Sequence, residues 1–228
     1  MTLAVRLRSA VSLLGRFPAL AGVDLDVAEG EVVLVQGANG AGKTTLLRAC
    51  AGLAAFASGE AEVLGHDLRR DRKAVRRRIG LLGHATFLYD DLTVADNLRF
   101  AARAAGASAA SADEAMTALG LDGRLREVAV AKLSAGQRRR AAVAVIVARR
   151  PDLWLLDEPH AGLDAAGRDL LDALVRGAAT RGATVVLASH ELDRAAAIAS
   201  RTVTMAGGQV IGGLLARPAP TMEPVHVA

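Results

Sequence analysis

The sequence predicts an α/β fold in which an antiparallel β subdomain precedes the core and an α-helical subdomain is inserted into it. Three observations lead to this fold class. A buried apolar run at residues 32–35 is followed by a glycine-rich loop and a helix. Strand-like patterns return at residues 153–156, 184–188 and 201–205. Between these sets lies an alanine-rich helical stretch, residues 93–149, and strands on both sides of such an insert are typical of an α/β core that carries a subdomain.

The first part of the chain predicts an antiparallel hairpin that feeds a core strand. Over residues 3–35 apolar and polar residues alternate in short pieces, and Val23, Leu25 and Val27 share one face of the second piece. A helix is expected from about residue 43 to residue 53, directly after the glycine-rich loop. The hairpin would form the N-terminal β subdomain beside the core.

The stretch from residue 60 to residue 82 combines short apolar runs with a basic cluster. We expect a strand at residues 60–64, an arginine-rich helix that ends near residue 78, and a strand at residues 79–82. The cluster consists of Arg69, Arg70, Arg72, Lys73, Arg76, Arg77 and Arg78. It contains no aromatic residues for base stacking, so we expect a solvated face, or one that meets acidic groups or lipid headgroups. A net charge of +4 therefore does not indicate a nucleic-acid partner.

Length and composition indicate a single domain. The chain has 228 residues, 52% of them apolar and 23% charged, which is typical of a folded globular protein. We expect one domain over residues 1–216, a helical subdomain at about 90–150 and a flexible tail at 217–228. The only cysteine, Cys50, excludes an intramolecular disulfide and a cysteine-based zinc site, which fits a reducing cytosol. The longest apolar stretch, residues 141–148, is far shorter than the roughly 20 residues that cross a bilayer.

A glycine-rich loop follows the apolar run at residues 32–35 and matches the pattern G-x-x-x-x-G-K-[ST]. Small residues let successive backbone N–H groups curl around an anion, and the start of the next helix adds partial positive charge. We expect Lys43 to reach the β- and γ-phosphates and the Thr44 hydroxyl to bind Mg²⁺. The loop therefore predicts a site for a nucleoside triphosphate. Its residues are Gly37, Ala38, Asn39, Gly40, Ala41, Gly42, Lys43, Thr44 and Thr45.

Two carboxylates follow the apolar strand at residues 153–156. Ligands of open α/β sheets bind at the carboxyl ends of the strands, so Asp157 and Glu158 are expected near the glycine-rich loop. We expect Asp157 to hold Mg²⁺ through water and Glu158 to act as general base on the water that attacks the γ-phosphate. Alone, an apolar run that ends in Asp-Glu is as typical of a surface turn as of a catalytic site. The upstream loop favours the catalytic interpretation.

A second helix start has the sequence LSAGQ at residues 133–137. Ser134 is a good N-cap, and a helix start can also bind an anion. Here the chain resembles the ABC ATPase family, whose LSGGQ signature differs only at Ala135. The resemblance implies a P-loop NTPase (RecA-like) core of the ABC ATPase fold, with two protomers that enclose two ATP molecules. It also implies that Ser134, Gly136 and Gln137 face the γ-phosphate that the partner holds.

Two further motifs are similar to those of the family. Asp164 ends the sequence AGLD, which resembles the D-loop that joins the two sites, and it can also cap the helix that begins near residue 165. His190 follows the strand that begins at residue 184, and the resemblance implies that this histidine contacts the γ-phosphate and the attacking water. The motifs keep a fixed order over nearly the whole chain and imply an ATPase.

Two positions depart from the family pattern. Leu14 stands where an aromatic residue usually stacks on adenine, so either Phe17 replaces it or the adenine lies on an aliphatic surface. His84 stands in the place of the Q-loop glutamine, which contacts Mg²⁺ and the transmembrane partner. An imidazole accepts a hydrogen bond, but it titrates near neutrality, unlike an amide. We therefore predict that His84 gives a pH-sensitive link between the nucleotide site and the partner.

The Gly-His pair at residues 83–84, together with Leu92-Thr93 and Asn97-Leu98, resembles the cytochrome c maturation branch of the family, the CcmA-type haem exporter ATPases. This resemblance implies a subunit that dimerises on ATP, as a homodimer, at the cytoplasmic face of the cell membrane. The subunit would power a separate membrane permease, which would dock on the loop at residues 83–92.

Two other functions agree with the same motifs. One is an ABC ATPase for another cargo, such as a drug, a peptide or a lipid, because no cargo contact lies in this subunit. The other is a soluble ABC ATPase of the iron–sulfur assembly type. Permease-dependent co-sedimentation with membranes would discriminate between the latter and a transporter subunit.

Overall fold

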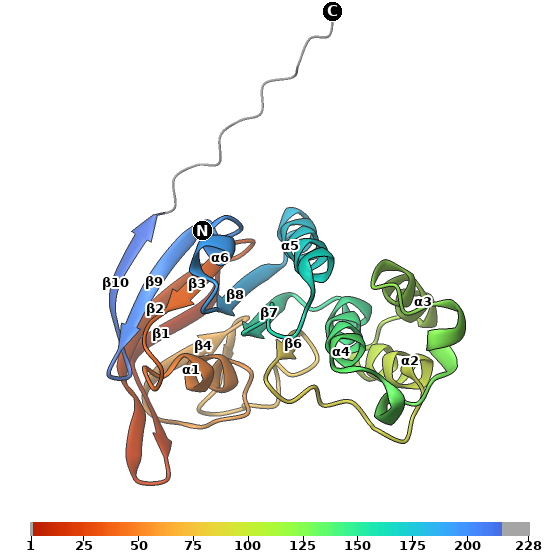
Figure 1. Cartoon of the computed structure of the whole chain (residues 1–228). Coiled ribbons are helices and arrows are strands. Elements are labelled where there is room, and N and C mark those ends of the chain that lie inside the picture. Colours follow the sequence, from red (N-terminus) through yellow and green to blue (C-terminus); the bar gives the residue numbers. More distant parts are fainter. Residues whose placement is uncertain (1, 216–228) are drawn as a thin grey trace, which may run out of the picture.

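The computed structural model describes residues 2–215, which form two β-sheets and a set of helices (Figure 1). The larger sheet has six strands. In spatial order they are β10 (Gln209–Leu215), β9 (Arg201–Ala206), β3 (Val32–Gln36), β8 (Thr184–Ala188), β7 (Leu153–Asp157) and β6 (Ile79–Leu82). All neighbours from β9 to β6 are parallel, and β10 is antiparallel to β9. The carboxyl ends of the parallel strands therefore meet at one edge.

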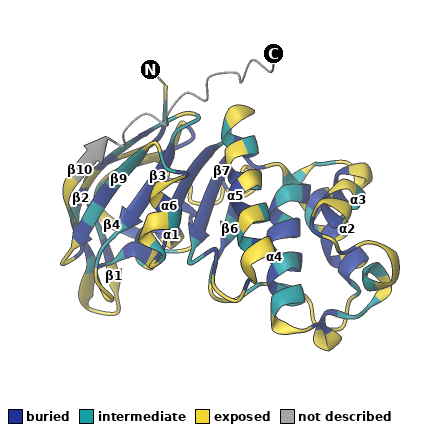
Figure 2. Cartoon of the chain, turned by 45° about the horizontal axis from the view of Figure 1, so that its top comes forward, coloured by how far each residue is buried: buried dark blue, intermediate teal, exposed yellow. Residues whose placement is uncertain are grey.

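The parallel strands are buried on both faces (Figure 2). On β3, Val33 and Val35 pack toward the antiparallel sheet, whereas Val32 and Leu34 pack toward the helices. Two-sided burial explains why this strand is a continuous apolar run instead of an alternating pattern. The predicted fold class, an α/β core with an antiparallel β subdomain and a helical insert, is confirmed.

The smaller sheet is antiparallel and has four strands. In spatial order they are β2 (Phe17–Ala28), β1 (Leu3–Leu14), β4 (Phe56–Val63) and β5 (His66–Asp67). Helix α1 (Lys43–Cys50) shares one hydrophobic cluster with both sheets, and Cys50 is buried in that cluster. The antiparallel sheet thus covers the side of the core on which α1 lies (Figure 1).

The helical insert lies between β6 and β7. It consists of α2 (Val94–Ala105), α3 (Ala109–Ala118), the 3₁₀ turns η1 (Gly123–Glu127) and η2 (Val130–Lys132), and α4 (Ala135–Arg149). Thr93 caps α2 and Ser108 caps α3 with side-chain oxygens that accept from the first turn. Gly106 ends α2 in the left-handed conformation, as expected of a glycine break. Two helices then follow in the core, α5 (Ala165–Thr180) and α6 (Leu192–Ala196).

The arginine-rich helix expected before residue 78 is wrong, because residues 68–78 form successive turns. The side chain of Asp67 accepts from the backbone N–H of Arg69 at 2.9 Å, and that of Asp71 accepts from Lys73 at 2.9 Å. Such local side-chain bonds compete with the helical ladder. Arg76 donates to the carbonyl of Gly52 at 2.9 Å, so part of the basic cluster is tied to the core instead of lying on a helix face.

Two elements have boundaries that differ from the expected ones. Helix α1 ends at Cys50, before residue 53, and β4 begins at Phe56, before residue 60. None of the helices within residues 2–215 is long and apolar enough to cross a membrane. The tail expected at residues 217–228 lies outside the described residues.

Candidate functional site

The glycine-rich loop joins the end of β3 to the start of α1, and at two of its glycines the backbone conformation and the surrounding atoms disfavour any side chain. Gly37 has φ +150° and Gly42 has φ +103°, a range that favours glycine. A Cβ on Gly37 would collide with the carbonyl oxygen of Met205 on β9. A Cβ on Gly42 would lie 2.7 Å from the carbonyl oxygen of Ala19 on β2. The loop is therefore enclosed by both sheets, and its backbone conformation is fixed by them.

Lys43 is the first residue of α1 and only 8% of it is exposed. Its ammonium donates to the carbonyl oxygens of Gly37 at 2.7 Å and Ala38 at 3.1 Å, so it points back into the loop. Ala41 is buried beneath the loop. Ala38, Asn39 and Gly40 lie at the exposed crest, where a ligand can approach, and Thr45 is half-buried in α1. A cation is thus held where the loop N–H groups can surround an anion.

The hydroxyl of Thr44 donates to Oδ2 of Asp157 at 2.7 Å. Thr44 lies in α1 and Asp157 ends β7, so the fold brings two predicted metal ligands together across 113 positions of sequence. Hard oxygen donors are the ligands that Mg²⁺ prefers, and Mg²⁺ is usually held by one or two protein groups and substrate phosphates. Within residues 2–215 no cluster of three or more His, Cys, Asp or Glu side chains could hold a metal. The pair fits the expected magnesium site.

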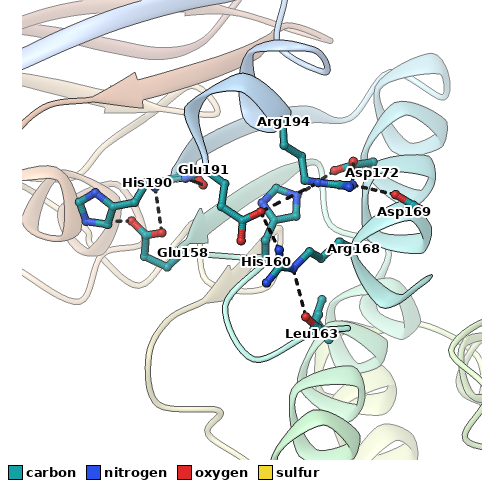
Figure 3. Close-up of polar contacts among 10 residues, drawn as sticks. Glu158, His160, Leu163, Arg168, Asp169, Asp172, His190, Glu191 and Arg194 are labelled. Atoms are coloured by element: carbon teal, nitrogen blue, oxygen red, sulfur yellow. Dashed lines mark hydrogen bonds and ion pairs between the residues drawn. The ribbon is translucent and has the colours of Figure 1, made fainter. Parts of the chain in front are cut away.

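Glu158 follows Asp157 and has φ +47°, a conformation that is rare for a residue with a side chain and typical of functional sites. Its backbone N–H donates to Ala188 at 2.8 Å, which ties it to the end of β8. Its carboxylate accepts from the backbone N–H of His190 at 3.0 Å, and Nε2 of His190 lies 3.4 Å from the other oxygen (Figure 3). Glu158, the predicted base, and His190, which is predicted to contact the γ-phosphate, therefore face each other.

A cavity of about 320 Å³ opens beside this pair, and it is lined by Gln36, Gly37, Ser189, His190, Leu192 and Thr204. Its walls come from the start of the glycine-rich loop, from the turn that carries His190 and from β9. The cavity therefore connects the phosphate-binding loop with the histidine.

The LSAGQ segment lies at the start of α4, in the helical insert and apart from α1 (Figure 1). The side chain of Ser134 accepts from the backbone N–H of Gln137 at 3.2 Å, and Oε1 of Gln137 accepts from the backbone N–H of Ser134 at 3.0 Å. This capping box fixes the first turn. A Cβ on Gly136 would lie 3.5 Å from the carbonyl oxygen of Gly162, so the segment borders the AGLD loop. No hydrogen bond within residues 2–215 links the side chains of Ser134 and Gln137 to the glycine-rich loop.

The family model for the ABC transporter matches residues 20–161, which is more than half of the chain. The chain belongs to the ABC transporter family. It is an ABC-type ATPase, and the resemblance carried by its motifs is confirmed. The fold of this family binds nucleotide, and a solved ATP-binding cassette of this fold is dimeric.

The curated relatives of this ABC ATPase include proteins of different cargo. The cytochrome c biogenesis ATP-binding export protein CcmA of Bordetella bronchiseptica is 38% identical over 211 residues, 90% of this chain and 94% of that protein. The human phospholipid-transporting ATPase ABCA7 is 35% identical over 85% of this chain but only 9% of that protein. Among solved structures, the dimeric post-hydrolysis state of the ATP-binding cassette MJ0796 bound to ADP and Pi has a TM-score of 0.85 and 25% identity, covering 94% of this chain and 100% of that chain.

The two departures from the ABC pattern lie on exposed surface. His84 follows β6 and is exposed; the register of β6 with β7, which pairs Leu82 with Leu156, places it at the same sheet edge as Asp157. Leu14 and Phe17 are 74% and 80% exposed beside the hairpin turn. The structure thus leaves both candidate adenine-stacking residues accessible. Their roles stay predictions.

Arg139 of the ABC ATPase is a site residue that the motifs do not indicate. Its guanidinium is buried, and it donates to the carbonyl oxygen of Gly83 at 2.7 Å and to the backbone carbonyls of Asp157 and Glu158. Burial lowers the pKa of Arg139, while the carboxylates of Asp157 and Glu158 oppose this shift.

The sequence carries no signal that distinguishes Arg139 from its neighbours. Residues 141–148 are continuously apolar, so Arg138, Arg139 and Arg140 all precede apolar residues by three, four and seven positions. Of the three arginines, the structure buries only Arg139. The arginine consequently links the signature helix to the strand ends that carry the site.

Proposed function

We propose that this protein is the ATP-hydrolysing subunit of a haem exporter in cytochrome c biogenesis. The observation that carries the proposal is the match with the CcmA relative of Bordetella bronchiseptica, which extends over 94% of that protein. The phospholipid-transporting relative is matched over only 9% of its length. The identity of 38% to 41% with CcmA relatives, against 35% with the phospholipid-transporting ATPase, favours the CcmA type. It also supports a peripheral location at the cytoplasmic face of the cell membrane.

We further propose the following roles at the nucleotide. The N–H groups of residues 37–45 and the ammonium of Lys43 bind the β- and γ-phosphates. Thr44 binds Mg²⁺ directly and Asp157 binds it through water; the ion neutralises charge on the phosphate oxygens when it is bound. Glu158 accepts a proton from the attacking water, and His190 orients the carboxylate and contacts the γ-phosphate. The contacts of Thr44 with Asp157 and of Glu158 with His190 support these assignments.

The signature segment is proposed to bind the γ-phosphate held by a second copy of the chain. Helix α4 has 15 residues and no acidic residue in its first turn, so the partial positive charge at its start is not neutralised there. Ser134 is exposed, and Gly136 and Gln137 are partly exposed beside it. A site on the surface of one protomer, apart from its own phosphate loop, supports a homodimer with two shared nucleotides.

The permease is proposed to dock in an apolar groove between the core and the helical insert. The groove has a volume of about 370 Å³, and Phe87, Tyr89 and Phe100 on its walls are 66%, 54% and 53% exposed. These are three of only six aromatic residues in the chain, and Tyr89 packs edge-on against Phe100 with ring centroids 5.4 Å apart. Exposed aromatic side chains gathered in a groove are typical of a site that receives an apolar helix.

Haem staining of c-type cytochromes tests the proposed cargo. A host strain that lacks the gene should lose the stain, wild type should restore it, and Glu158→Gln should not, although the variant protein should still reach the membrane fraction. The exposed Glu114 gives a matched control, because Glu114→Gln should restore staining. Normal staining without the gene would overturn the haem assignment and leave an ABC ATPase for another cargo.

A further inference from the structure

The two segments that carry Glu158 and His190 both form hydrogen bonds with side chains of helix α5. The first loop runs from Glu158 to Asp164, and the second leads from His190 into α6. Both contribute polar groups that converge on one face of α5 (Figure 3). The contacts are arranged in two layers, one around Asp172 and one around Arg168.

Asp172 joins the two loops in the inner layer. Its Oδ1 lies 2.8 Å from Nε2 of His160, in the first loop, and its Oδ2 accepts from Arg194, in α6, at 2.6 Å. Because the carboxylate also accepts from a guanidinium, Nε2 of His160 supplies the hydrogen of the first contact. Side chains of His160 and Asp172 are 1% and 9% exposed, so the contact is shielded from water.

Arg168 joins the same loops in the outer layer. Its Nε donates to the carbonyl oxygen of Leu163 in the first loop at 3.1 Å. Its other end donates to Oε2 of Glu191, directly after His190, at 3.2 Å. Residues 168 and 172 are four apart and therefore lie on the same face of α5. Each of them binds one group from the first loop and one from the segment that follows His190, which is Glu191 for Arg168 and Arg194 of α6 for Asp172.

The imidazole of His160 carries an energetic penalty that an apolar side chain with a purely structural role would avoid. Its Nδ1 is buried and has no hydrogen-bond partner within residues 2–215. A buried unpaired acceptor is unfavourable, and an apolar side chain of similar size would avoid it. What the histidine adds is a rigid donor that reaches from the first loop to Asp172.

We propose that His160 is a positioning residue and that Asp172 and Arg168 form a double clamp. The clamp fixes the loop of Glu158 relative to the loop of His190. The carboxylate is thereby held in place to accept a proton from the attacking water. This inference rests on the proposed role of Glu158 as general base. It requires that loss of His160 slows hydrolysis without weakening ATP binding, since no hydrogen bond in the described part of the chain joins His160 to the phosphate loop or to Thr44.

Steady-state ATP hydrolysis by the full-length protein tests the clamp through the split between kcat and KM. His160→Leu should lower kcat by about 10- to 100-fold, because small displacements of a reacting group have effects of this size. The KM for ATP should stay within about 2-fold. His160→Gln should recover most of kcat, because its amide nitrogen can donate to Asp172 as Nε2 does. The exposed His66 on β5 is the matched control, and His66→Leu should behave as wild type.

Three outcomes would overturn the proposal: an unchanged kcat in folded His160→Leu, a KM that rises together with the fall in kcat, or no recovery in His160→Gln. If His160→Leu does not fold, as judged by thermal melting, Arg168→Met removes the outer layer at a partly exposed residue. It should give the same loss of kcat, and a wild-type kcat would overturn the clamp. Full activity of Glu158→Gln would instead overturn the role of Glu158, so the two failures are distinguishable.

Discussion

Helices α1 and α4 both begin at a segment that we propose to bind an anion, but their first turns are built in opposite ways. The start of α1 is Gly42 in the left-handed conformation, without any side-chain cap. The start of α4 is a complete capping box made by Ser134 and Gln137. An uncapped start leaves its N–H groups to a ligand, whereas a capped start satisfies part of them within the chain. The difference suggests that α1 binds phosphate within one protomer and that α4 is a rigid surface for a second protomer.

Glu158→Gln gives the largest expected effect. It also tests whether the start of α1 in one protomer and the start of α4 in the other bind the same nucleotide. Loss of the general base should lower kcat by about 10²- to 10⁴-fold, while ATP binding is retained. With hydrolysis slowed, an ATP-dependent dimer should accumulate, which sedimentation velocity measures with and without ATP. A variant that stays monomeric in saturating ATP would contradict the assignment of α4 to the partner's nucleotide.

Lys43→Ala tests the α1 half of the comparison. Removing the ammonium that points into the loop should weaken ATP binding by about 100-fold, the size expected for a charge-assisted contact with phosphate. Equilibrium binding of ATP measures the effect, with Lys73→Ala in the basic turns as control. Equal affinities for the wild type and Lys43→Ala would show that α1 does not hold the phosphates.

Ser134→Ala tests the α4 half. Loss of the cap should lower the free energy of unfolding by about 1 kcal/mol and should reduce ATP-dependent dimerisation, but not ATP binding by the monomer. Ser108 caps α3 in the same helical insert, so Ser108→Ala should show the loss of stability alone. Chemical denaturation and sedimentation separate the two effects. Equal dimerisation of both variants would reduce Ser134 to a structural cap.

Asp26→Asn gives the smallest expected effect. It measures how much an ion pair outside the two helix starts, Arg8 with Asp26, contributes to the free energy of unfolding. The hydrogen bonds from Arg8 lower the pKa of Asp26 below its ordinary value of 3.8, so folding favours the carboxylate. Its stabilisation is present above that value and is lost as the pH falls through the lower pKa of the folded protein. Because the pair is partly exposed, we expect less than about 1 kcal/mol at pH 7. Denaturation of the wild type and of Asp26→Asn at pH 7 and at pH 3 measures this stabilisation. A difference in free energy of unfolding that is larger at pH 3 than at pH 7 would contradict the expected direction.

Local patterns predicted the parts of this molecule in which one physical cause dominates. The apolar runs at β3 and β7 are buried on both faces, and the glycine-rich loop has glycines at positions whose positive φ favours this residue. The arginine-rich segment failed because the side chains of Asp67 and Asp71 hold local turns, which compete with helical hydrogen bonds at nearly equal energy.

Tertiary contacts account for the site residues that sequence reasoning missed. His160 and Asp172 are 12 positions apart, in a loop and in a helix, and neither belongs to a motif. Only the fold shows that they meet. Arg139 is one of three adjacent arginines ahead of a continuous apolar run, so the helical period is the same for all three and does not show which of them is buried.

The burial of Cys50 leaves the protein with a chemically silent thiol. Burial raises the pKa of Cys50 to about 12, so almost no thiolate exists at neutral pH, and the residue is the only cysteine in the chain. A cysteine introduced on the exposed surface would therefore be the single reactive site for a maleimide dye or a spin label. Cys50 would not have to be removed first. Pairs of labelled protomers could then report how the distance between two copies changes during an ATP cycle.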